Sequence, residues 1–329
     1  MKKTLSVLQL ILFLFFESCS DDFNINAPYQ DIYVLNCILR NDNSIQYAIF
    51  SKNSFTENGI PPSSTSAAQN IKEANLKIFY NDSVFVMRDT TIELTDSENS
   101  RVNCFYLKNL ILSPWKVISI EASVPGGKIL KSTIQVPKIS FADFSRKFPQ
   151  VTELGDYQER PFYSWSWVGN AQESTAILDI PQLEVYYKHY EQGIYVDKKV
   201  LVPLAFYFII DQFGNLSPVN VEISFNTFCV TKLETVDKTL RDLSGNDPHK
   251  EDYTITKVVF SVISMDSELS KYYSAYETYS ENFTIKLRQT DFSNIEGGKG
   301  IFGIYYKFSL PLVIDSRYIE SFGYRYDPL

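Results

Sequence analysis

Apolar and polar residues alternate with a period of two along much of the chain, which predicts β-strands joined by short turns. Apolar-rich runs at residues 32–40 and 46–52 flank a polar turn cluster, and runs at 74–80 and 83–89 flank Asn81-Asp82, a signal for a tight hairpin. A further hairpin is expected around residues 125–127. Regularly spaced short strands without a helical period predict an immunoglobulin-like β-sandwich over residues 31–138.

Residues 139–329 are expected to form a larger β-rich domain. Its first strand covers 162–168, where Tyr163, Trp165 and Trp167 alternate with serines, so the three rings share one face. Further strands are predicted at 183–190 and 199–211. The rings either pack in the core or form an aromatic platform for a ligand, and the sequence leaves both readings open.

Two segments of this second domain have helical spacing instead. Apolar residues recur every three or four positions in 231–243, and Gly245 suits the end of that helix. A second helix is predicted over 266–280, with Asp266 or Ser267 as its N-terminal cap. It carries a stripe of tyrosines that serves either packing or partner binding, and the stripe includes Tyr272, Tyr276 and Tyr279.

The first residues indicate export. A basic start precedes an apolar run from Leu5 to Phe16, which is too short to cross a bilayer and suits a signal peptide at residues 1–18. Ser18-Cys19 resembles a lipobox, so we expect lipidation of Cys19 and a tether over 19–30. The residues Ser20, Asp21, Asp22 and Phe23 resemble the surface-export signal of Bacteroidota lipoproteins. An anchor of two or more acyl chains would hold the protein at the outer membrane.

Composition narrows the function further. The formal net charge is −8, and without a basic patch such a chain is not expected to bind nucleic acid. Beyond Cys19 there are Cys37, Cys104 and Cys229, too far apart for a clustered zinc site. Cys37 and Cys104 either form a disulfide or, with Cys229, stay buried as thiols.

The glycines Gly297, Gly298, Gly300 and Gly303 include the spacing G-x-G-x-x-G, which is typical of dinucleotide-binding loops. Such a loop requires a helix directly after the glycines, because the free N–H groups at its start hold the pyrophosphate. Residues 304–314 are β-branched and aromatic and predict a strand instead. We therefore expect no nucleotide cofactor and interpret the glycines as a structural loop that permits positive φ angles.

The tyrosine-rich segment SKYYSAYETY followed by NIEGGKGIFG is similar to the C-terminal signature of domain-of-unknown-function family 4249, a family of Bacteroidota lipoproteins. The lipobox, the β-rich N-terminal part and the length agree with that family, so the resemblance covers most of the chain. Tyr186-Tyr187 stands later than in the family pattern. Members are commonly encoded beside TonB-dependent transporters, and the resemblance implies an accessory surface lipoprotein without catalytic residues.

No motif for catalysis or metal binding emerges from the sequence. His189 and His249 lack a second histidine at metal-ligand spacing, and no G-x-S-x-G stretch is present. The expected function is therefore a non-catalytic accessory subunit of a TonB-dependent uptake complex or another outer-membrane β-barrel complex. The alternative is a free-standing lipoprotein that binds glycan or peptide through Trp165, Trp167 and the tyrosines of the second helix.

Overall fold

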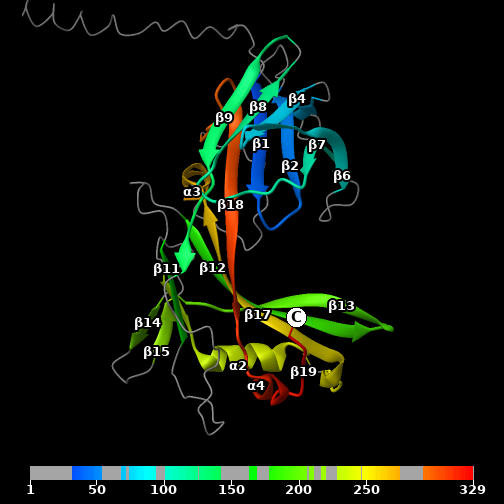
Figure 1. The fold of residues 1–329 in the computed structure, drawn as a ribbon, viewed down its shortest axis with the longest axis vertical. Coiled ribbons are helices and arrows are strands. Elements are labelled where there is room, and N and C mark those ends of the chain that lie inside the picture. The colour runs from blue at the N-terminus through cyan, green and yellow to red at the C-terminus, as the bar shows by residue number, and fades with distance from the viewer. Residues whose placement is uncertain are drawn as a thin grey trace, which may run out of the picture.

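The protein is mainly β in the computed structural model, as the sequence predicts (Figure 1). The structure describes residues 32–53, 68–71, 74–93, 101–124, 126–141, 163–168, 178–205, 207–210, 216–219, 228–245, 247–274 and 292–328. The predicted signal peptide, Cys19 and the export signal at Ser20–Phe23 therefore lie outside the described residues, as do Tyr276 and Tyr279.

A 10-stranded sheet forms the spine of the molecule. Its hydrogen-bonded path runs β13-β12-β17-β18-β1-β2-β7-β6, with β19 beside β17 and β3 beside β2. The strands are β1 (Ile32–Arg40), β2 (Ile45–Asn53), β3 (Ala68–Asn70), β6 (Arg88–Glu93), β7 (Arg101–Lys108), β12 (Asp179–Glu191), β13 (Ile194–Val202), β17 (Tyr253–Met265), β18 (Lys299–Leu312) and β19 (Arg325–Tyr326).

A second sheet covers one end of the spine and completes a β-sandwich. Its order is β5 (Ser83–Val86), β4 (Asn75–Tyr80), β8 (Val117–Ser123) and β9 (Ile129–Gln135). Asn81 and Asp82 have positive φ angles in the β4–β5 turn, which confirms the predicted hairpin. The apolar faces of the two sheets meet in one core, in which Leu35, Phe50 and Ile120 are almost fully buried.

One strand from the far end of the chain completes the sandwich. The start of β18 pairs in parallel with β1, from Val34 opposite Lys299 to Arg40 opposite Tyr305. Its second half pairs with β17. The predicted boundary between 31–138 and 139–329 therefore does not separate the hydrogen-bonded sheets. Alternation within each strand could not reveal this pairing, because it joins segments more than 250 residues apart.

The other end of the spine carries smaller elements. One small sheet contains β10 (Ser140–Phe141), β11 (Tyr163–Val168) and β16 (Phe228–Thr231). Another pairs β14 (Tyr207–Ile210) with β15 (Leu216–Val219). The prediction of one strand over 199–211 is wrong: β13 ends at Val202, because Pro203 has no N–H to continue the ladder.

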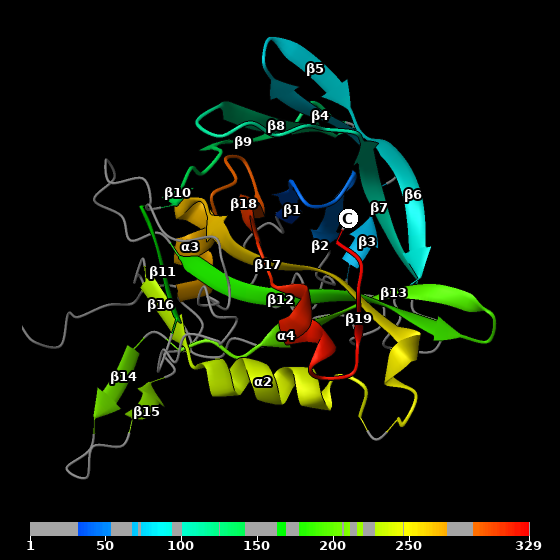
Figure 2. The same ribbon diagram turned by 60° about the horizontal axis from the view of Figure 1, so that its bottom comes forward.

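Both predicted helices are present and one more is added; the predicted part of the second helix beyond Ser274 lies outside the described residues. Helix α2 (Leu233–Asp242) lies beside the spine, and Gly245 follows it with φ +61° (Figure 2). Helix α3 (Ser267–Ser274) begins after Asp266, whose Oδ1 accepts from the N–H groups of Glu268 and Leu269 at 2.8 and 3.1 Å, the predicted cap. The unpredicted α4 (Ser316–Glu320) and a 3₁₀ turn at Lys250–Asp252 complete the described helices.

The strand predicted from residues 304–314 is present, but β18 already begins at Lys299, so the prediction of a loop holds for Gly297 and Gly298 and is wrong for Gly300 and Gly303, which lie inside the strand. Gly300 has φ +117°, and a Cβ there would overlap the carbonyl oxygen of Leu35, so the position needs glycine for both angle and space. Gly298 instead needs space alone, since its Cβ would lie 2.8 Å from the oxygen of Tyr33. Gly297 has a positive φ, and Gly303 packs against Leu269. Gly298 and Gly300 thus let the start of β18 lie close against β1.

Candidate functional site

The two tryptophans proposed as ligand contacts lie in the core. Trp165 is 3% exposed and Trp167 1%, and both rings pack against Phe260. The indole N–H of Trp167 donates to Asp179 at 2.8 Å. Tyr272, a residue of α3, is also buried. The alternation correctly predicts that the β11 rings share one face. That face packs into the core, so the rings are not accessible to a ligand.

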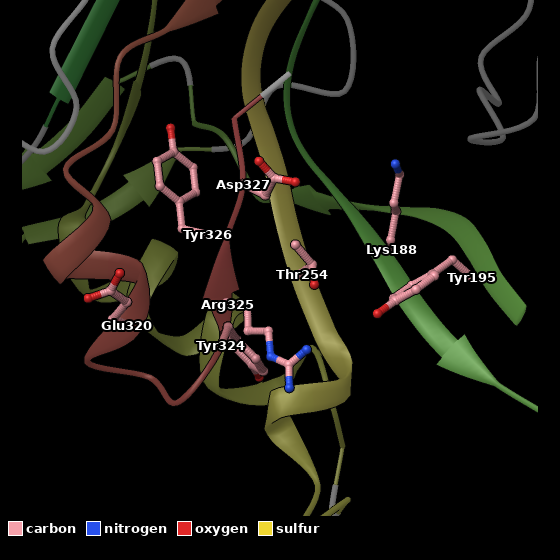
Figure 3. Close-up of a pocket in the computed structure, with 8 residues that line it drawn as sticks. All are labelled: Lys188, Tyr195, Thr254, Glu320, Tyr324, Arg325, Tyr326 and Asp327. Atoms are coloured by element: carbon pink, nitrogen blue, oxygen red, sulfur yellow. The ribbon is translucent and has the colours of Figure 1, made fainter. Parts of the chain in front are cut away.

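An open cleft of about 690 Å³ lies elsewhere, between the β12–β13 hairpin and the C-terminal segment (Figure 3). That size falls within the usual range for small-molecule sites. The lining residues come from β12, β13, β17, α4 and the end of the chain, and they are Lys188, Tyr195, Thr254, Glu320, Tyr324, Arg325, Tyr326 and Asp327.

Strand register places the floor of the cleft. Lys188 of β12 is opposite Thr254 of β17, and Thr254 is opposite Arg325 of β19. Directly opposed residues project from the same face of a sheet, so two cations flank a hydroxyl in one row. Asp327 follows two residues after Arg325, and its N–H donates to the oxygen of Ile255 at 3.0 Å, which fixes the segment to β17.

The β12–β13 hairpin forms one wall. Gln192 and Gly193 both have positive φ angles, at 50° and 88°, as a two-residue type I′ turn requires. Tyr195 follows this turn with 56% of its surface exposed, and its ring reaches towards β17 (Figure 3). It contacts the ring of Tyr190 at 5.0 Å between centroids. The pair gives the end of the hairpin an aromatic surface next to the cleft.

The opposite wall is rigid. Tyr324 is 2% exposed, and its hydroxyl donates to the oxygen of Leu240 at the end of α2, at 2.6 Å. Tyr326 is half-buried against the same core, and burial raises its pKa. Both tyrosines therefore hold the C-terminal segment in place, which leaves Arg325 and Asp327 exposed towards the cleft.

A charged group surrounds His189 on the other face of β12. The imidazole stacks on Tyr253 at 3.9 Å, and Nδ1 lies 2.5 Å from Oε1 of Glu191. Nε2 lies 4.0 Å from Oδ2 of Asp247, which accepts from the Tyr253 hydroxyl at 3.1 Å. Burial and the Asp247 carboxylate raise the pKa of Tyr253 to about 12. An imidazole between two carboxylates can shuttle protons, but no described serine, threonine or cysteine hydroxyl or thiol is hydrogen-bonded to it.

A metal site, a disulfide and a membrane-spanning helix are all absent from the described ranges. No group of three or more histidine, cysteine or acidic side chains there is arranged to hold a metal ion. Cys37, Cys104 and Cys229 are buried free thiols, the second of the two readings that the sequence left open, and burial raises the pKa of all three. Within the same ranges no helix is long and apolar enough to cross a membrane.

No known protein family has a model that matches this chain, and a search of curated proteins found no match.

Sequence reasoning did not find the cleft. One signal was present at the end of the chain, where Tyr324-Arg325-Tyr326-Asp327 alternates aromatic and charged residues. Period two there predicts charges on one face and rings on the other. What the sequence could not show is that this short strand lies beside β17, because β19 has only two residues.

Proposed function

We propose that the protein is a non-catalytic, lipid-anchored lipoprotein on the outer face of an outer membrane, where it acts as an accessory subunit of a TonB-dependent uptake complex or another β-barrel complex. The lipobox at Cys19, the export signal at Ser20–Phe23 and the resemblance to domain-of-unknown-function family 4249 support the location and the class.

The observation that carries the docking role is the end of the β12–β13 hairpin. It projects from the edge of the spine (Figures 1 and 2) and exposes Ile194 to 64% and Tyr190 to 43%. A projecting apolar and aromatic tip is typical of a partner contact, since tyrosine is enriched at protein interfaces. A lipid anchor would confine this tip to encounters with proteins of the same membrane.

The test is affinity purification of the lipidated protein from outer membranes in mild detergent, followed by mass spectrometry. We expect a stoichiometric β-barrel partner that is lost from the double variant Ile194→Ser with Tyr190→Ser. The matched control is Ile111→Ser on the sandwich, where the side chain is 81% exposed. Recovery of a lone lipoprotein, or equal loss of the partner from the control, would contradict the docking role.

Anchoring is tested separately by Cys19→Ser. Without the thiol no acyl chain can be attached, so we expect the variant to leave the membrane pellet and appear in soluble fractions. Fractionation with an antibody measures this shift. A variant that stays with the membrane would show that something other than lipid holds the protein there.

A second candidate function is direct capture of a small ligand, glycan or peptide. The cleft between the hairpin and the C-terminal segment favours it, because exposed Tyr195 and several polar groups converge there. The candidate contacts are therefore cleft residues rather than Trp165 and Trp167, whose rings are in the core.

A further inference from the structure

The cleft holds four charged side chains that make no salt bridge. Lys188, Arg325, Glu320 and Asp327 all line it, and none has an ion-pair partner among the described residues. Arg325 acts on Glu251 only through a weak charge effect on the pKa of that residue.

Neighbouring charges on the same hairpin behave differently. Lys198 bonds Glu191, and Lys199 bonds Glu184 at 2.8 Å. Two lysines of β13 are thus paired with carboxylates of β12. In the cleft, both signs are present on facing elements and remain apart, which leaves room for a ligand to bridge them.

The positions of the charges suit a ligand with two ends. Lys188 and Arg325 flank Thr254 on the floor, while Glu320 stands on α4 at the far wall and Asp327 at the chain end (Figure 3). An arginine fork pairs well with a carboxylate, and a lysine adds charge without demanding geometry. Carboxylates are the corresponding partners for an ammonium group.

The geometry points to a short peptide with free termini as the ligand of this cleft, a zwitterion whose carboxylate pairs with Arg325, with Lys188 adding positive charge from the other side of Thr254, and whose ammonium meets Glu320 or Asp327. Tyr195 lies on the hairpin side of the cleft, near Lys188, where its ring offers the peptide an apolar surface (Figure 3). This inference rests on the second candidate function and names its ligand class.

Other ligand classes fit less well. A neutral glycan stacks on ring faces and uses neutral hydrogen-bonding groups, so it would leave four charges unused and partly desolvated. A polyanion would meet Glu320 and Asp327 as well as the two cations. A zwitterion uses both signs and places no charge next to a like one.

The experiment is calorimetry on the detergent-solubilised full-length protein with four probes. These are trialanine with free termini, trialanine acetylated at the N-terminus and amidated at the C-terminus, trialanine acetylated only at the N-terminus, and a neutral glucan hexasaccharide. We expect binding of free trialanine and at least tenfold weaker binding of the blocked peptide, since both charge contacts are lost.

Variants assign the binding to the cleft. Arg325→Gln and Glu320→Gln are each expected to weaken free trialanine several-fold, whereas Arg101→Gln, an exposed arginine on the sandwich, is the matched control and leaves binding unchanged. The charge reversal Glu320→Lys should invert the preference between two peptides. The new lysine repels the ammonium group of free trialanine, so the variant should bind trialanine that is acetylated only at the N-terminus more tightly than free trialanine. This preference cannot arise from misfolding.

The outcomes separate the hypotheses. Equal binding of free and blocked peptide, or peptide binding that ignores Arg325→Gln, overturns the zwitterion inference. Hexasaccharide binding that needs Tyr195 but not the charges overturns it too, and keeps ligand capture. No binding of any probe by the folded protein overturns both this inference and the second candidate function, while the β-barrel docking role is decided by its own purification experiment.

Discussion

Glu184 and Lys188 project from the same face of β12, yet their charges are treated in opposite ways. Glu184 has no exposed surface and accepts from Lys199 at 2.8 Å, Lys307 at 2.6 Å and Ser261 at 3.0 Å. Lys188 lies four residues further along β12. It is half-exposed and forms no salt bridge among the described residues. A saturated charge network holds a sheet together, whereas an unsaturated one is available to a ligand.

The pKa of Glu184 reflects this saturation. Burial opposes ionisation of the carboxyl, but the hydrogen bonds and charges of Lys199 and Lys307 outweigh burial and lower the pKa below its ordinary value. The network joins β12, β13, β17 and β18, so it ties the hairpin that bears the cleft to the central strands.

The largest effect on stability is expected when Glu184, the acceptor at the centre of the buried charge network, is removed. Glu184→Ala leaves Lys307, whose side chain is only 11% exposed, without a partner, and should lower the free energy of unfolding by about 3–5 kcal/mol. Urea denaturation measures the change. Glu320→Ala in the cleft is the control, expected within about 0.5 kcal/mol. Similar losses in both variants would erase the distinction between the two regions.

A buried carboxylate held only by backbone groups sharpens the comparison. Asp266 is fully buried, accepts from the N–H groups of Ile304, Glu268 and Leu269, and burial raises its pKa to about 7. Its folded-state pKa exceeds the unfolded one, so its contribution is present at acid pH and lost as pH rises towards 7. The free energy of unfolding should therefore fall by on the order of 3 kcal/mol between pH 4 and 8 through this group.

Asp266→Asn keeps the cap acceptor but cannot titrate. Denaturation across the same pH range should show the loss only in the parent protein. Glu184→Gln supplies the opposite sign, since a lowered pKa gives stability that is present above the ordinary range and lost on acidification. If the free energy of unfolding depends on pH in the same way for both variants, the pKa values of Asp266 and Glu184 are not shifted in opposite directions.

The smallest effect on stability is expected inside the cleft. Lys188→Met and Arg325→Gln remove charges that form no salt bridge among the described residues, so each should change the free energy of unfolding by less than about 0.5 kcal/mol. Thermal melts measure this, with Arg101→Gln as the surface control. A stabilisation or loss well above that size would mean that these charges serve the fold rather than a ligand.

Much of the fold could be predicted because residues close together in the sequence determine it. Asn81-Asp82 gives its hairpin through two residues that tolerate positive φ, and Asp266 caps α3 through one short side chain. The face shared by Tyr163, Trp165 and Trp167 follows from period two. Each of these features depends on residues within a few positions of one another.

What the sequence could not give depends on long-range pairing. The burial of the β11 rings requires Phe260 on β17, and the cleft requires β19 to lie beside Thr254. Neither partner is near in sequence, and β13 stops at a proline that looked like part of a longer apolar run. Sequence alone therefore points to the aromatic strand and the tyrosines of the second predicted helix as ligand contacts, rather than to the charged residues 324–327.

The seat of β18 in the sandwich has a consequence for biogenesis. An exported chain emerges with its N-terminus first, and β1 meets its parallel neighbour only after residues 299–305 have followed. Until then one edge of β1 exposes unpaired backbone groups, the situation in which strands recruit wrong partners. Such distant pairing also slows folding, because the loop must close before any contact forms. On the proposed export route, the protein is expected to depend on periplasmic holding factors until its last segment has crossed.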